Sequence, residues 1–114
     1  MSDKSLELVK GTLDVLILRT LAWQSMHGYG ISQWIRGRTG GTLAVQDAAL
    51  YQALRRLERR GLVEAEWGVS ENNRRARFYT LTPAGRERLL EETAAWRRYA
   101  KAGSQVLDPL PGEA

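Results

Sequence analysis

At Gly61 the spacing of the apolar residues changes from that of a helix to that of a β-strand. The residues before it carry leucines three or four positions apart, which predicts an amphipathic helix over 46–60. These leucines are Leu50, Leu54 and Leu57. From residue 63 to 69 apolar and polar side chains alternate, the pattern of a half-buried strand. Gly61 itself stands where helices commonly end in a left-handed glycine, so we expect the strand to follow the helix directly.

Helical spacing of apolar residues predicts three further helices, over about 5–23, 29–38 and 83–107. The last of them follows Thr82 and Pro83, a good N-capping residue and a residue favoured in the first helical turn. The first two are joined by a short loop at 25–28, so the chain begins with a bundle of short helices.

Residues 77–81 predict a second strand, and the polar segment 70–75 predicts the turn of a β-hairpin. Three helices followed by a hairpin and a long helix make an α+β fold, mostly α: a winged helix-turn-helix, whose wing is the hairpin. We expect residues 1–81 to form this unit and residues 82–108 a C-terminal dimerisation helix of the same domain. Residues 109–114 are expected to be a disordered tail.

The composition excludes several classes of chemistry. The 114 residues suit one domain, and they include no cysteine and one histidine, His27. Disulfides, thiol nucleophiles and multi-histidine metal sites are therefore excluded, and no carboxylate pair or nucleophile–base spacing stands out. We expect no enzyme, no cofactor and no metal, and we expect His27 to pack or hydrogen-bond near Gly28. No targeting segment opens the chain, and the most apolar stretch, 13–23, is too short to span a membrane, so we expect a cytoplasmic protein.

The charge is positive and concentrated in the middle of the chain. There are 17 Lys and Arg residues, 14 of them Arg, against 13 Asp and Glu, giving a net charge of +4 and a pI near 9.9. Residues 28–77 hold nine arginines and five acidic residues, which accounts for the whole excess. The planar, forked guanidinium suits phosphates and base edges, so this distribution favours a nucleic-acid partner.

If the leucines of the helix 46–60 face inward, its opposite face is basic. The candidate DNA-binding residues on and beside that face are Ala48, Ala49, Tyr51, Gln52, Arg55, Arg56 and Arg59. The alanines allow close approach to bases and contact with a thymine methyl. Gln52 and Arg55 have the geometry to pair with adenine and guanine, each good pair being worth about 1–3 kcal/mol of discrimination. The hairpin adds Arg74, Arg75 and Arg77 for flanking phosphates or the minor groove. The alternative is that these arginines solvate the surface, some of them paired with Glu58.

Several segments together resemble the PadR family of bacterial transcriptional regulators. They are Lys10–Asp14, His27–Ile31, Leu50–Leu62, Trp67, Arg74–Arg75 and Arg77–Gly85, in the family's order and spacing. The resemblance, strongest with the short subgroup, implies a winged helix that dimerises through its N- and C-terminal helices and mostly represses transcription. Three positions depart from it: Ala48 and Ala49 replace a glycine and a hydroxyl residue, and Gln52 replaces a proline. The operator sequence therefore cannot be transferred from relatives.

A heptad-like seam along 89–107 has small residues among its apolar ones, which favours close packing against other helices, a symmetry mate included. With the N-terminal helix, the predicted dimer interface comprises Leu6, Val9, Leu13, Leu89, Thr93, Trp96, Ala100, Gly103 and Leu107. Trp23 and Trp96 are candidates for a pocket that stacks a small planar ligand, apolar or cationic, as some relatives do; plain dimer packing is the alternative. Trp34 and Trp67 are expected in the core.

The leading hypothesis is a homodimeric repressor that binds a palindromic operator in double-stranded DNA through the helix 46–60 and the wing. A planar effector at the dimer interface would release it. The main alternative is a winged-helix protein-interaction module that does not read DNA sequence. An RNA-binding winged helix is a third hypothesis, which no aromatic stacking platform supports, and an enzyme is the last.

Overall fold

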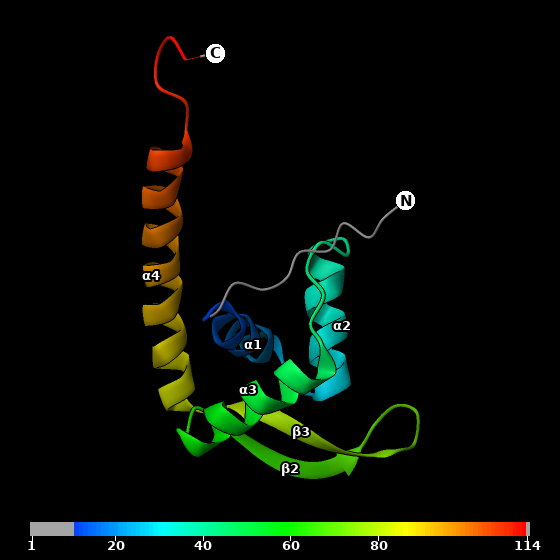
Figure 1. The fold of residues 1–114 in the computed structure, drawn as a ribbon. Helices are drawn as coiled ribbons and strands as arrows, with labels where there is room; N and C mark the ends of the chain where they lie inside the picture. Colours follow the sequence, from blue (N-terminus) through cyan, green and yellow to red (C-terminus); the bar gives the residue numbers. More distant parts are fainter. Residues whose placement is uncertain (1–10, 114) are drawn as a thin grey trace.

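The computed structural model describes residues 11–113, which form four helices and three strands. In chain order they are α1 (Thr12–Trp23), β1 (Met26–His27), α2 (Gly28–Arg38), α3 (Asp47–Arg59), β2 (Val63–Val69), β3 (Arg75–Leu81) and α4 (Pro83–Leu107). The short helices α1, α2 and α3 lie together above the hairpin of β2 and β3, and α4 extends away from them (Figure 1). This is the winged helix-turn-helix that the sequence predicts.

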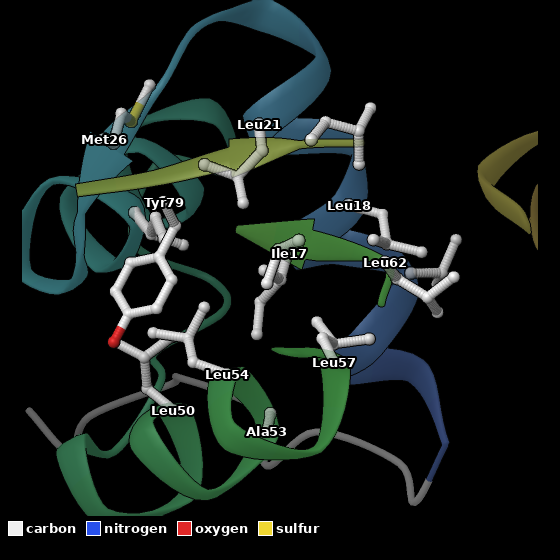
Figure 2. Close-up of a cluster of buried hydrophobic side chains, with 14 of the residues drawn as sticks. Ile17, Leu18, Leu21, Met26, Leu50, Ala53, Leu54, Leu57, Leu62 and Tyr79 are labelled. Atoms are coloured by element: carbon white, nitrogen blue, oxygen red, sulfur yellow. The ribbon is translucent and has the colours of Figure 1, made fainter. Parts of the chain in front are cut away.

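Helix α1 is the centre of the core. Its residues Ile17 and Leu18 are fully buried, and it contacts all three other helices and β3. Figure 2 shows side chains of α1 and α3 pointing toward one another, with Tyr79 beside them. The predicted leucine stripe of α3 is confirmed, because Leu50, Leu54 and Leu57 are all buried. Burying a side chain of this size contributes about 1.5–3 kcal/mol, so this stripe holds α3 in place.

The first helix starts later than the predicted residue 5. It begins at Thr12 because Gly11 has φ 92°, in the left-handed region that an α-helix does not use. Residues 5–10 of the prediction lie outside the described part of the chain. The three-stranded sheet is antiparallel in the order β1-β3-β2. Sequence analysis placed a loop where β1 lies, since a two-residue strand is defined only by its pairing, Met26 with Tyr79 and His27 with Phe78.

Helix α3, the hairpin and α4 meet at one hydrogen-bonded junction. Gly61, with φ 73°, ends α3 in a Schellman motif: its N–H donates to the Glu58 carbonyl, and that of Leu62 to the Leu57 carbonyl. The Thr82 hydroxyl donates to the Gly61 carbonyl (2.7 Å) and accepts from the Gly85 N–H (3.0 Å), which caps α4. The predicted roles of Gly61 and Thr82 and the predicted bounds of α4 are therefore confirmed.

Candidate nucleic-acid interface

The outward face of α3 carries the predicted reading residues. Ala48, Ala49, Tyr51, Gln52, Arg55, Arg56 and Arg59 are all exposed, while the leucines on the other side are buried. The two alanines lie in the first turn, the part of a recognition helix that reaches deepest into a major groove. The predicted orientation of the helix is confirmed, and contact of these residues with DNA stays a prediction.

The arginines of α3 differ in their partners. Arg56 donates to the Asp14 carboxylate at 2.8 Å and so ties α3 to α1. Within residues 11–113, Arg55 and Arg59 form no ion pair, so their charges are available to a ligand. The alternative that Glu58 pairs with helix arginines is wrong in this part of the chain, because Glu58 accepts a hydrogen bond from Arg77 of β3 at 2.9 Å. That ion pair fastens the wing to the recognition helix.

The hairpin extends past the core and exposes its outer half. Strand β3 begins at Arg75, two residues before the predicted start, and Arg75 pairs with Val69. Trp67, expected in the core, is 58% exposed, so that prediction is wrong. The physical reason is that the core ends near Ala65 along this face, while the hairpin continues. The Arg75 guanidinium covers the Trp67 ring at 4.6 Å from its centroid.

The turn of the wing presents Arg74 to solvent. Its backbone is closed by two hydrogen bonds, from Ser70 N to the Arg74 carbonyl and from Asn73 N to the Ser70 carbonyl, both 2.8 Å. Asn73 has φ 58°, which asparagine tolerates better than most residues. The acidic residues of β2, Glu64 and Glu66, are exposed and alternate with the inward-facing positions, so they point to the other side of the hairpin.

Where α2 begins, its backbone touches Tyr51 of α3. A Cβ on Gly28 would lie 2.5 Å from the Tyr51 hydroxyl oxygen, so glycine lets the two helices of the helix-turn-helix approach. His27 caps α2, because its Nδ1 accepts from the Gly30 N–H at 3.0 Å, which confirms the predicted hydrogen-bonding role. The contact of Gly28 with Tyr51 was missed by sequence reasoning, which assigned this glycine to a turn.

Between α3 and the hairpin lies a groove of about 720 Å³, which we call the wing groove. Four arginines line it: Arg55, Arg74, Arg75 and Arg77. So do four tyrosine or tryptophan rings, those of Tyr29, Tyr51, Trp67 and Tyr79. Burial raises the pKa of the Tyr79 phenol above its ordinary value, and the neighbouring Arg77 charge opposes this shift. Sequence reasoning treated the helix and the wing separately and did not find the groove.

The predicted dimer residues fall into three groups. Leu6 and Val9 lie outside the described residues. Leu89 is 8% exposed and belongs to the protomer's own core, and Leu13 packs against that core, so the assignment of Leu89 to an interface is corrected. Thr93, Ala100 and Gly103 are half-buried, and Leu107 is exposed. The reason is that the first part of α4 packs on α1, whereas its later turns extend beyond α1 (Figure 1).

Two tryptophans and further apolar side chains lie at the surface of these helices. Trp23 of α1 and Trp96 of α4 are 63% and 50% exposed. Sequence reasoning missed Tyr99 and Val106, which are exposed beside the seam on α4. Trp34 is half-buried against the core, and the Arg38 guanidinium lies over its ring.

No group of three or more potential metal-ligating side chains is found among residues 11–113. Over the same residues, no helix combines the length and apolar character that crossing a membrane requires.

Comparison with known proteins identifies the family. The family model described as "Transcriptional regulator PadR-like family" matches residues 17–91. An uncharacterised protein from Lysinibacillus sphaericus is 32% identical over 90 residues, 79% of this chain and 83% of its own. A transcriptional regulator from Clostridium thermocellum has a similar structure (TM-score 0.77, 29% identity, covering 84% of this chain and 93% of that one). So does a PadR family transcription regulator from Clostridium difficile (0.73, 28%, 85% and 99%). The chain therefore belongs to the PadR-like family of transcriptional regulators, and it is a DNA-binding regulator.

Proposed function

We propose that this protein is a cytoplasmic homodimeric repressor that binds a palindromic operator through α3 and the wing. The observation that carries the proposal is the arrangement of charge on one surface. Arg55 and Arg59 of α3 and Arg74 of the wing are exposed and have no acidic partner among the described residues, while Glu64 and Glu66 face away. Such a surface attracts the phosphates of a duplex on both sides of a helix that is narrow enough for the major groove.

The residues of this surface take different roles. Gln52 and Arg55 read base edges, and Ala48 and Ala49 let the first turn of α3 approach them. Tyr51, Arg59, Arg74 and Arg75 contact the sugar-phosphate backbone. Arg56 and Arg77 hold α1 and the wing to α3 through their ion pairs, and their remaining N–H groups reach phosphates.

The dimer forms through the later turns of α4 and the N-terminal helix. The exposed apolar side chains there, Trp96, Tyr99, Val106 and Leu107, are covered when a second copy packs against them. The two recognition helices then meet half-sites about 34–36 Å apart. In this dimer Trp23 and Trp96 bound a pocket for a planar apolar or cationic effector that releases the operator.

The test selects bound sequences from a pool of random duplexes and measures their affinity at several salt concentrations. We expect a dyad-symmetric site. Arg55→Ala should relax the preference at one position of each half-site. The matched control is Arg86→Ala, which removes the same charge from the start of α4 and should leave the preference unchanged. A pool that returns no dyad, or equal losses in both variants, contradicts sequence reading by α3.

A further inference from the structure

The wing groove gathers exposed aromatic rings from three different elements. Tyr29 of α2 is 67% exposed, Tyr51 of α3 is 43% exposed, and Trp67 of β2 lies opposite them across the groove. Its volume of about 720 Å³ falls within the range of small-molecule sites. Aromatic side chains left in water are a favourable surface for a flat ligand, because stacking removes apolar area on both sides.

The charge in the groove has one sign. Its lining includes four arginines and no aspartate or glutamate. Within the described chain only Arg77 of these four has a carboxylate partner, Glu58. The N-terminus of α2, at Gly28 and Tyr29, opens into the same space and adds the positive end of a helix dipole. A cation is therefore repelled from the groove, and an anion is attracted.

The contact of Arg75 with Trp67 shows how a ligand fits. The guanidinium lies over the ring at 4.6 Å, so one face of Trp67 already accepts a flat π-system. An aromatic ring that takes this place leaves the guanidinium beside it. Arg75 is then positioned to bind the anionic group of the ligand, together with Arg55 and Arg74 from the two sides of the groove.

We propose that the wing groove is a binding site for a small planar aromatic anion, such as an arene carboxylate. The ring stacks on Trp67 near Tyr29 and Tyr51, and the carboxylate binds the arginines. This site is separate from Trp23 and Trp96 and selects the opposite charge. Because Arg55 and Arg74 are also proposed DNA contacts, a bound ligand competes directly with the operator. That consequence rests on the proposed function, whereas binding to the free protein does not.

The experiment uses the full chain without DNA and 2-naphthoate as the probe. The four tryptophan indole N–H resonances are followed by NMR and assigned with Trp→Phe variants. We expect a saturable shift of the Trp67 resonance, with those of Trp23 and Trp96 unchanged. The uncharged analogue 2-naphthalenemethanol should bind about tenfold more weakly or less, because it lacks the charge-assisted hydrogen bonds.

Two variants test the arginines. Arg74→Gln should weaken 2-naphthoate binding about tenfold, since a charged hydrogen bond is lost. Arg86→Gln, the matched control on α4, should leave it unchanged. No saturable shift at Trp67, equal binding of the two probes, or equal losses in both variants would overturn the site.

Competition with a selected duplex is measured separately. If 2-naphthoate binds as expected but no operator is found, only the proposed function fails. If the operator binds but 2-naphthoate does not, only the groove proposal fails.

Discussion

Gly85, in the first turn of α4, is the position where the smallest possible addition should do the most damage. A Cβ there would overlap the carbonyl oxygen of Leu62 and lie 2.7 Å from a methyl group of Leu81. The Leu62 oxygen cannot retreat freely, because it accepts the Thr82 N–H at 3.1 Å. Gly85→Ala must therefore separate the start of α4 from the loop that ends α3.

The size of the effect follows from the contacts that must change. Overpacking costs about 1–3 kcal/mol. The backbone hydrogen bond to Leu62 and the Thr82 cap contribute about 1 kcal/mol each and are both at risk. Replacing a helical glycine by alanine returns about 1 kcal/mol. The net expectation is a loss of about 2–4 kcal/mol in the free energy of unfolding, or roughly 10 °C in Tm for a chain of this size.

Thermal and urea unfolding, followed by circular dichroism at one protein concentration, measure this loss. The control is Gly37→Ala on α2, where a Cβ meets no heavy atom within 4 Å, and it should be neutral or stabilising by up to about 1 kcal/mol. Equal stability of the two variants would refute the reasoning, because it would mean that α4 does not rest on the Leu62 backbone.

Three further predictions concern single side chains. His27→Ala should cost about 1 kcal/mol in urea unfolding because Gly30 N–H loses its cap, and His27→Asn should recover part of it; equal losses would contradict a capping role. Tyr79 has a raised pKa, so its contribution is complete below its unfolded-state pKa near 10 and is lost as pH rises through the higher folded-state value; stability measured from pH 8 upward should fall less steeply in Tyr79→Phe, and identical slopes would argue against it. Gly103→Ala should weaken self-association in sedimentation velocity, because α4 presents this half-buried glycine on the proposed dimer face; an unchanged dimer would remove Gly103 from the contact.

Much of the local structure was readable from the residues because its signals act over a few positions. The leucine stripe of α3, Gly61 as its left-handed end, and Thr82 with Pro83 as the start of α4 all depend on neighbouring backbone and caps. The same holds for the outward face of α3, since a helix that buries one stripe must expose the opposite one.

The tertiary structure decided what depends on residues far apart in the chain. No periodicity pairs Arg56 with Asp14 or Arg77 with Glu58, and none brings Tyr51 onto Gly28. The alternation along β2 marks one face of a strand, but how far the core extends along that face is set by the helices packed on it, so Trp67 is exposed and Leu89 is buried. The sequence by itself determined the elements and the basic character of their surface, because these are local properties. Packing determined which arginines are paired and which line the wing groove, because only the assembled fold brings α3 and the hairpin to the same place.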